Sequence, residues 1–318
     1  MMQTPWKLEN QRTYFSKALV ELGRSDPKVV VVGADTTESV KTMSFGKEFP
    51  GRLFNVGIAE QNMMGIAAGL AAAGQTPYAC TYSVFGTAQV YNVIRQAIAY
   101  PSLNVKIFCS HAGLTTGPDG ATHQMNEDIA LMRGLPNMTV LVPADAPETG
   151  RAVLAAADWD GPVYCRFSRA NFPTVTRPED PFEIGRAAVM RDGSDVTLVG
   201  CGIMVSRCLL AAEELAKVGL QARVLNVHTV KPLDAAAVIK AARETGAIVT
   251  AEEHLYQGGL GSAVAQALVE ARPVPMSAVA LADTYTKSGT PDQLLEKYGL
   301  TPERIVAAVR SAVARKPR

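Results

Sequence analysis

Residues 29–33 read Val-Val-Val-Val-Gly, and this stretch decides the fold class. A run of β-branched residues without polar alternation predicts a strand buried on both faces, as in a parallel sheet covered by helices. Outward from it, short apolar runs alternate with helical stretches, which is typical of α/β folds. Further strands are expected at 52–56, 78–82, 104–109, 138–142 and 163–167, and helices at 12–23, 60–73, 86–99, 124–133 and 146–157.

The alternation is interrupted between residues 171 and 193, where three prolines stand among mixed charges. Prolines at this density indicate a linker. Strands are then expected again at 196–200, 221–227, 247–251 and 274–282, and helices at 205–217, 234–245, 261–271 and near 292 and 302. We therefore predict an α/β protein of two domains with mostly parallel sheets. The domains are expected at 1–175 and 190–318, with a linker over 176–189.

Composition argues against several classes of protein. The 318 residues are 47% hydrophobic and carry 31 Lys plus Arg against 30 Asp plus Glu. This balance disfavours nucleic-acid binding through a general basic field. The longest apolar stretch, residues 63–73, is shorter than the roughly 20 residues that span a bilayer, and no secretory signal is evident. The five cysteines form no C-x-x-C pair, so we expect a reducing, cytoplasmic compartment and no metal site.

Polar residues follow the predicted strands of the first domain. Because the carboxyl ends of parallel strands meet at one edge of a sheet, ligands of open α/β folds bind there. The candidate residues at this edge are Asp35, Ser39, Glu60, Tyr82, Phe85, His111, Asp119, His123, Ser168 and Arg169.

Glu60 opens the predicted helix E-Q-N-M-M-G-I-A-A-G-L. A carboxylate in a first turn favourably complements the helix dipole, which is its ordinary structural role. The alternative is a buried carboxylate that bonds to a ring nitrogen of a ligand. Both interpretations stay open from spacing alone.

Two of the four histidines, His111 and His123, share one glycine-rich loop. They are either solvated loop residues or groups for proton transfer and substrate hydrogen bonding. A metal pair is disfavoured because their separation gives no ligand geometry. Arg12, Ser39, His111 and Arg169 could together bind an anion, most plausibly phosphate. The sequence G-G-L-G at 258–261 could also bind phosphate at a helix N-terminus, although a tight turn is the simpler interpretation.

Several motifs carry a resemblance to a known family. They are F-N-V-G-I-A-E-Q-N at 54–62, P-Y-x-x-T-Y-S-V-F at 77–85, G-P-D-G-A-T-H-Q at 117–124, R-F-S-R at 166–169, V-K-P-L-D at 230–234 and E-E-H-x-x-x-G-G-L-G-S at 252–262. With them the chain resembles the C-terminal half of a transketolase. That thiamine-diphosphate enzyme transfers a two-carbon ketol unit between sugar phosphates.

The resemblance implies roles for individual residues. Residues 1–175 would be the pyrimidine-binding domain, and residues 190–318 the transketolase C-terminal domain. Glu60 would bind N1′ of the aminopyrimidine, and Phe85, Tyr82, Asp35 and Ile58 would complete the cofactor site. His111 and His123 would line the substrate channel and assist catalysis. Asp119 would recognise a sugar hydroxyl, and Arg12, Ser39, His111 and Arg169 would bind the substrate phosphate.

The sequence departs from the family pattern at a few positions. Ala88 stands where a further aromatic residue is often found, Thr36 where an apolar residue often supports the cofactor, and Asn62 where histidine is frequent. These departures affect the cofactor packing and the acceptor preference that the resemblance implies.

A missing motif shapes the expected assembly. The diphosphate half of the family carries G-D-G followed by an asparagine, which hold Mg²⁺ and diphosphate, and no G-D-G occurs here. We therefore expect a split transketolase that acts on sugar phosphates with thiamine diphosphate. A separate N-terminal subunit would supply the site for Mg²⁺ and the diphosphate, in an α₂β₂ assembly.

Three alternatives stay open. The first is a subunit of a pyruvate-using enzyme of the deoxyxylulose-phosphate-synthase type. The second is a non-catalytic partner subunit of a thiamine enzyme. The third is a dinucleotide-binding protein, which rests only on the G-G-L-G sequence.

Overall fold

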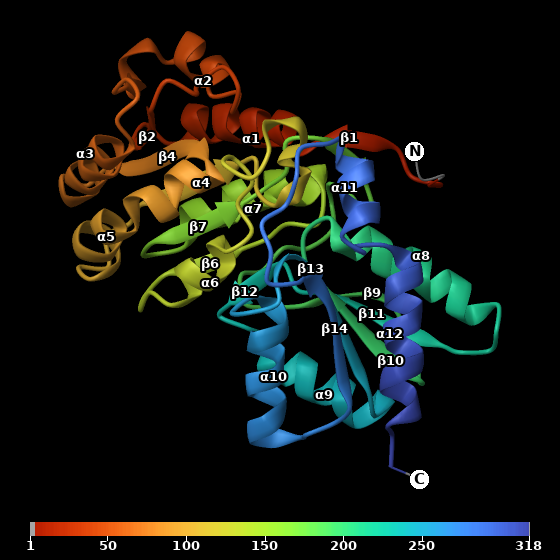
Figure 1. The fold of residues 1–318 in the computed structure, drawn as a ribbon. Coiled ribbons are helices and arrows are strands. Elements are labelled where there is room, and N and C mark those ends of the chain that lie inside the picture. The colour runs from red at the N-terminus through yellow and green to blue at the C-terminus, as the bar shows by residue number, and fades with distance from the viewer. Residues whose placement is uncertain (1–3, 318) are drawn as a thin grey trace.

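The computed structural model describes residues 4–317, which fold around two main β-sheets. Figure 1 shows the two sheets in neighbouring parts of the molecule, most strands of the first coloured from orange (β2) to green (β7) and those of the second from green to blue. The first sheet has the strand order β12-β6-β7-β5-β4-β2-β3. Its strands are β2 (Val29–Gly33), β3 (Leu53–Asn55), β4 (Thr76–Tyr82), β5 (Lys106–Ser110), β6 (Thr139–Leu141), β7 (Val163–Arg166) and β12 (Thr229–Lys231).

The second sheet has the order β14-β13-β10-β11-β9. Its strands are β9 (Ala188–Arg191), β10 (Val196–Gly200), β11 (Ala222–Asn226), β13 (Ile248–Leu255) and β14 (Met276–Leu281). Only β12 in the first sheet and β9 in the second pair antiparallel with their neighbours. The prediction of an α/β fold with mostly parallel sheets is therefore confirmed.

Helices cover both sheets (Figure 1). Those of the first half are α1 (Gln11–Ser25), α2 (Met43–Glu48), α3 (Glu60–Ala72), α4 (Ser83–Gly86), α5 (Tyr91–Val93), α6 (Asp128–Arg133) and α7 (Ala146–Asp158), with short 3-10 helices η1 (Pro50–Arg52), η2 (Ala88–Val90) and η4 (Leu114–Asp119) and a π-helix η3 (Ile94–Ala99). Those of the second half are α8 (Met204–Ala216), α9 (Ala235–Thr245), α10 (Leu260–Ala271), α11 (Pro291–Lys297) and α12 (Pro302–Ala314).

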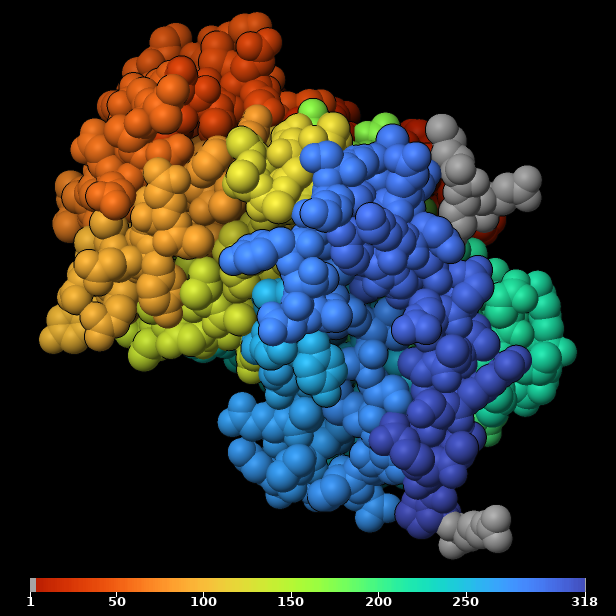
Figure 2. Space-filling view, viewed as in Figure 1, coloured from red at the N-terminus to blue at the C-terminus, as the bar shows by residue number. Residues whose placement is uncertain are grey.

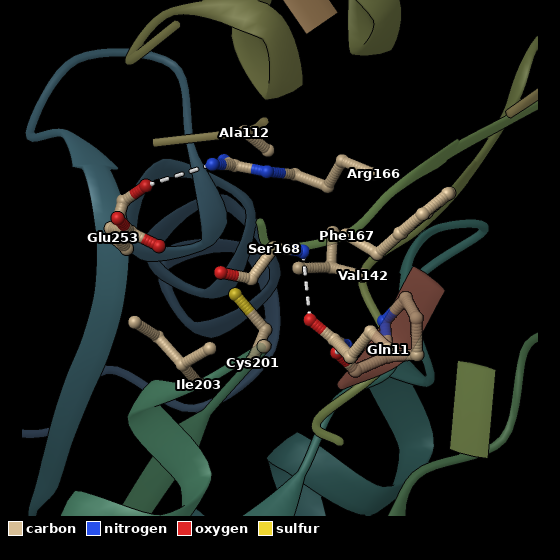
Figure 3. A pocket seen from close by; sticks show the side chains of 11 residues that line it. Gln11, Ala112, Val142, Arg166, Phe167, Ser168, Cys201, Ile203 and Glu253 are labelled. Carbon is tan, nitrogen blue, oxygen red and sulfur yellow. Dashed lines mark hydrogen bonds between the residues drawn. The ribbon is translucent and has the colours of Figure 1, made fainter. Parts of the chain in front are cut away.

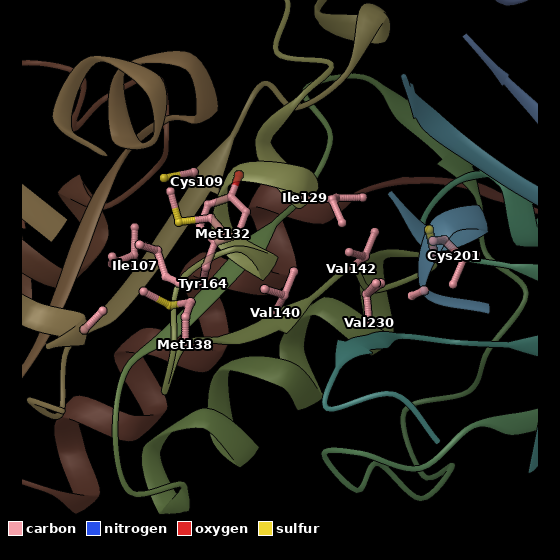
Figure 4. Packing of buried hydrophobic residues seen from close by; sticks show 14 of the residues in the cluster. Ile107, Cys109, Ile129, Met132, Met138, Val140, Val142, Tyr164, Cys201 and Val230 are labelled. Carbon is pink, nitrogen blue, oxygen red and sulfur yellow. The ribbon is translucent and has the colours of Figure 1, made fainter. Parts of the chain in front are cut away.

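The two halves of the chain are joined by more than a linker. Strand β12 comes from the second half and extends the first sheet through β6. One hydrophobic cluster runs from Tyr164 and Val140 in the first half of the chain to Val230 and Cys201 in the second half, as Figure 4 shows. This shared core holds the carboxyl edge of the first sheet against the second half of the chain.

Two predicted elements differ in the structure. The helix expected over 86–99 does not continue from α4, because Thr87 adopts non-helical angles (φ −129°, ψ −81°). It is divided into η2, α5 and η3, and Val90, with φ −118° and ψ 11°, separates η2 from α5. The helix expected from residue 124 begins only at Asp128, because the preceding residues bond to the second half of the chain. Strands β8 (Asn171–Pro173) and β9 lie within the stretch expected to be irregular, and β8 pairs with β1 (Leu8–Asn10).

Within residues 4–317, no helix is long and apolar enough to cross a bilayer. The same residues contain no cluster of three or more His, Cys, Asp or Glu side chains that could hold a metal ion. All five cysteines are free and buried. Burial raises the pKa of thiols such as Cys208, to about 12, so the cysteines pack as small apolar side chains.

Candidate active site

The strand order sets the order of the candidate residues along the sheet edge. Neighbouring strands β3, β2, β4, β5 and β7 end beside one another. Glu60 follows β3, Asp35 follows β2, Tyr82 ends β4 and His111 follows β5. The residues expected to hold a cofactor and those expected to hold a substrate are therefore neighbours along this edge, since Ser39 follows β2 together with Asp35.

Glu60 is the first residue of α3 and is only 5% exposed. Its Oε2 accepts a hydrogen bond of 3.2 Å from Nε2 of Gln89, a residue that the motifs did not single out. A carboxylate at this position also lies in the favourable field of the helix N-terminus. The structure thus presents a buried carboxylate whose described side-chain partner is one neutral amide.

The surface beside Glu60 is open. Ile58, two residues earlier, is 83% exposed. Asp35 is also exposed, and its backbone has φ +60°, which places it in the left-handed region. Its Oδ1 accepts a hydrogen bond of 3.2 Å from Nδ2 of Asn55, whose own Oδ1 accepts from the Asp35 N–H at 2.9 Å. The segment before α3 therefore exposes a large apolar side chain close in sequence to a buried carboxylate.

Aromatic rings connect the middle of the edge. The rings of Tyr82 and His111 stack with centroids 3.7 Å apart, and the rings of Tyr82 and Phe85 stack with centroids 5.8 Å apart. Phe85 also meets His123 edge-on at 5.5 Å. The four predicted residues therefore form one contiguous group, although His111 and His123 belong to a different loop from the two aromatic residues.

His111 is electrostatically distinct. It is 1% exposed, and its Nδ1 lies 2.8 Å from Oγ of Ser110. Burial, followed by the nearby positive charges of Arg12 and Arg169, lowers its pKa to about 3. At neutral pH the imidazole is thus uncharged, which suits it to hydrogen bonding rather than to charge pairing with an anion.

Positive charge gathers next to this histidine. Nη1 of Arg12 donates to the Ser39 carbonyl oxygen at 2.9 Å, and the Tyr82 hydroxyl donates to Ser39 Oγ at 2.7 Å. Burial and the charge of Arg169 lower the pKa of Arg12. In turn, burial and the charge of Arg12 lower the pKa of Lys41. Among residues 4–317, neither Arg12 nor Lys41 has a carboxylate within ion-pair distance, so the cluster is suited to an anionic ligand.

Asp119 takes a role that the motifs did not suggest. Its Oδ1 accepts a hydrogen bond of 3.0 Å from Nη1 of Arg169, which also donates to the Thr116 carbonyl oxygen at 3.0 Å. Asp119 therefore orients Arg169 in this state of the chain. The resulting pair leaves the positive charges of Arg12 and Lys41 without a matching carboxylate.

The three positions that depart from the family pattern lie on this open side. The Thr36 hydroxyl donates to Thr81 Oγ1 at 3.2 Å, so this position carries a pair of hydroxyl groups. Ala88 and Asn62 are exposed. The structure therefore places all three where a ligand or a neighbouring subunit could still touch them.

The G-G-L-G sequence does not form an open phosphate site. At the N-terminus of α10, the Leu260 and Gly261 N–H groups donate to the two carboxylate oxygens of Glu252, at 2.6 and 2.7 Å. A Cβ at Gly259 would lie 2.0 Å from Glu252 Oε2, so glycine is required for this close approach. The dinucleotide-binding alternative loses its support because the chain's own carboxylate occupies the anion position.

Comparison with known proteins agrees with this geometry. Residues 10–175 match the family model "Transketolase, pyrimidine binding domain", and residues 185–305 match "Transketolase, C-terminal domain". The chain belongs to the transketolase family. Together the two models span most of the chain, so the resemblance in the motifs is confirmed at the level of the family.

The transketolase relatives include subunits of similar length. The chain is 42% identical over 312 residues to the 6-deoxy-6-sulfo-D-fructose transketolase subunit SqwH of Clostridium sp. strain MSTE9, with 98% and 97% of the two chains covered. It is 38% identical over 295 residues to a subunit of the apulose-4-phosphate transketolase of Phocaeicola vulgatus, covering 92% and 94%. A solved structure described as a split gene transketolase, an inactive beta4 tetramer, is 50% identical with a TM-score of 0.92 and coverage of 97% and 99%.

The sequence did not predict three residues that lie at the carboxyl edge of the first sheet beside the candidate site. Lys41, Gln89 and Asn55 each contact a predicted residue or add to its charge. Lys41 lies two positions after Ser39, and its charge was a usable signal. Gln89 and Asn55 carry no such signal, because polar amides are common on any surface.

Proposed function

We propose that this chain is the C-terminal subunit of a split transketolase that transfers a two-carbon ketol unit from a ketose to an aldose, both bearing a terminal anion. One observation carries the proposal. The buried Glu60 carboxylate, the neutral His111 and the cation cluster Arg12–Lys41 share a single sheet edge. Such an edge offers a buried carboxylate, a neutral hydrogen-bonding group and an anion-binding group together.

The donor set fits thiamine diphosphate as the cofactor. Glu60 offers a buried carboxylate with a neutral partner, suited to hold a proton shared with a ring nitrogen. Phe85 is half-buried and offers a face for the ring to stack on. When bound, the cofactor supplies the nucleophilic carbon that takes up the two-carbon unit. Tyr82, Asp35 and the exposed Ile58 are proposed to complete this part of the site.

On the substrate side, His111 and His123 are proposed to hydrogen-bond the sugar hydroxyls. The depressed pKa of His111 keeps its imidazole neutral, so it can donate one hydrogen bond and accept another. Arg12, Lys41 and Arg169, with Ser39, are proposed to bind the terminal anion. Asp119, which already holds Arg169, would exchange that contact for a sugar hydroxyl.

The relatives favour an anionic substrate without fixing which one. One is a transketolase subunit for a sulfonated fructose, and another for apulose 4-phosphate. A phosphate and a sulfonate share the tetrahedral anionic oxygens that guanidinium groups recognise. We therefore propose a sugar phosphate as the default substrate and a sugar sulfonate as the variant to be tested beside it.

We propose a separate N-terminal subunit that supplies the Mg²⁺ and diphosphate site, in an α₂β₂ assembly. The absence of a G-D-G sequence and the exposure of Ile58 beside Glu60 support this arrangement. The test is calorimetric titration of thiamine diphosphate with Mg²⁺ into each subunit alone and into their mixture. Binding that requires the mixture supports the proposal, and tight binding by this chain alone contradicts it.

The donor is tested with the same mixture. Transfer from a ketose phosphate or ketose sulfonate supports a transketolase. If pyruvate is the only donor that is used, the result would instead favour an enzyme of the deoxyxylulose-phosphate-synthase type. No turnover with any donor, despite cofactor binding, would favour a non-catalytic subunit.

A further inference from the structure

The loop that carries the two histidines is held by the second half of the chain. Gln124 Nε2 donates to the Lys287 carbonyl oxygen at 3.0 Å, and its Oε1 accepts from the hydroxyl of Thr286. Leu255 N–H donates to the Asn126 carbonyl oxygen at 2.8 Å. In Figure 2 the yellow surface of this region lies directly between the orange first half and the blue residues that lead into α11. The loop is thus bounded on one side by the second sheet's connections.

Glu253 makes the most direct of these contacts. It lies near the end of β13, and its Oε1 accepts a hydrogen bond of 2.7 Å from the Thr115 N–H in η4. Gly113, with φ +74°, packs so closely that a Cβ there would lie 2.2 Å from the Glu253 carboxyl carbon. The backbone of the loop is therefore shaped around this one carboxylate.

The Glu253 carboxylate is embedded in a buried polar group. Arg166 Nη2 donates to the Glu253 carbonyl oxygen at 3.2 Å, and Arg166 Nη1 lies 3.1 Å from Asp128 Oδ1. Figure 3 shows this hydrogen bond between Arg166 and Glu253, with Ala112 beside Arg166, and all three residues line a cavity of about 20 Å³. This is room for about one water molecule, and Ala112 is the residue of the loop that lines the cavity.

The contact of Glu253 leads directly to substrate-binding residues. Thr116 follows Thr115, and its hydroxyl donates to the His111 carbonyl oxygen at 2.7 Å. The Thr116 carbonyl oxygen accepts from Nη1 of Arg169 at 3.0 Å. A single loop residue thus joins the hydrogen bond of Glu253 to both His111 and Arg169.

We propose that Glu253 is a positioning residue, which fixes the loop over 111–119 from the second domain and so holds His111 and Arg169 in their binding geometry. The assignment of those two residues as substrate groups rests on the proposed function. The contacts that fix the loop do not depend on it. Because of this, the two can be tested separately.

Glu252 provides a matched control for the loop test. It is the adjacent residue, it is also buried, and its carboxylate bonds to α10 instead of to the loop. Hydrogen–deuterium exchange is measured by peptide on the full chain and on its Glu253→Ala and Glu252→Ala variants. We expect Glu253→Ala to raise exchange in residues 111–119 by about tenfold, the loss of one charge-assisted hydrogen bond, and to leave residues 260–263 unchanged.

Glu252→Ala should give the reverse pattern. If both variants raise exchange in both segments alike, or if 111–119 does not change in Glu253→Ala, the proposal is overturned. Should Glu253→Ala not fold, Glu253→Gln decides. Its amide oxygen still accepts from Thr115 but without charge, so about a threefold rise in 111–119 is expected and no rise contradicts the proposal.

A kinetic measurement tests the consequence for the substrate. In the complex with the N-terminal subunit, Glu253→Gln should raise KM for a phosphorylated donor by about threefold while the affinity for thiamine diphosphate is unchanged. An unchanged KM together with a loosened loop would overturn the link to binding. A wild-type complex without ketol transfer would instead refute the proposed function and leave the exchange result standing.

Discussion

The imidazole of His111 lies on the phenol ring of Tyr82, with centroids 3.7 Å apart and the planes inclined by 23°. The Tyr82 hydroxyl donates a hydrogen bond of 2.7 Å to Ser39 Oγ. The stack fills the space around the histidine and removes its ring from water. The Tyr82 side chain therefore contacts both the buried His111, whose pKa is low, and Ser39 of the anion-binding residues.

The first prediction concerns the pH dependence of stability. In the unfolded chain the His111 imidazole has a pKa of about 6.5, whereas burial in the folded chain lowers this pKa to about 3. The unfolded state binds more protons in this window, so His111 makes the fold lose stability as the pH falls through it. The free energy of unfolding is measured with urea for wild type and His111→Gln at about pH 7 and about pH 5.5. Between these pH values the difference in unfolding free energy between the two proteins should shift by about 1 kcal/mol in favour of the variant.

This comparison cancels other titrating groups. Glu148 and Glu252 have pKa values raised by burial to about 7, and they act in the opposite direction over part of the same range. Both are present in wild type and variant alike, so the difference isolates His111. A difference that stays constant between the two pH values would show that the imidazole is not protected in the fold.

The second prediction concerns the cation cluster. Arg12→Ala and Lys41→Met each remove one positive charge from the cation cluster. Among residues 4–317, no carboxylate lies within ion-pair distance of either residue. We expect KM for a phosphorylated ketose donor to rise by about tenfold or more in the reconstituted complex, because each residue offers a charge-assisted hydrogen bond. An uncharged ketose is the control donor, and its KM should stay within about twofold. Equal changes for both donors would refute an anion site.

The third prediction concerns the G-G-L-G turn. Since Glu252 already accepts from the Leu260 and Gly261 N–H groups, a pyrophosphate would meet a carboxylate there. Calorimetric titration with NAD should show no binding to the full chain. Binding that is lost when Gly261 is substituted would contradict this interpretation.

The sequence predicted the strands better than the loops between them. Apolar runs such as 29–33 specify buried strands on their own, because burial on both faces leaves one consistent pattern. By contrast, β12 needs β6 from the other half of the chain, and Gln124 leaves the predicted helix because Thr286 and Lys287 bond to it. Local periodicity cannot report such long-range partners.

The candidate site shows the same division. Glu60, His111 and Arg169 could be nominated because strand ends and motifs mark them. Glu253 could not be assigned to the loop, because its place depends on how the second sheet meets Thr115. Asp119 was expected to face a sugar hydroxyl, and its contact with Arg169 depends on the folded loop.

The central claim is that Glu60 and the anion-binding residues form half of a ketol-transfer site. It is tested most directly by mixing this chain with the N-terminal subunit, thiamine diphosphate and Mg²⁺, and measuring ketol transfer from a ketose phosphate with wild type and Glu60→Gln. The account predicts turnover by the wild-type mixture, none by either subunit alone, and a rate lower by at least about 100-fold in the variant. A near-normal rate with Glu60→Gln would contradict it.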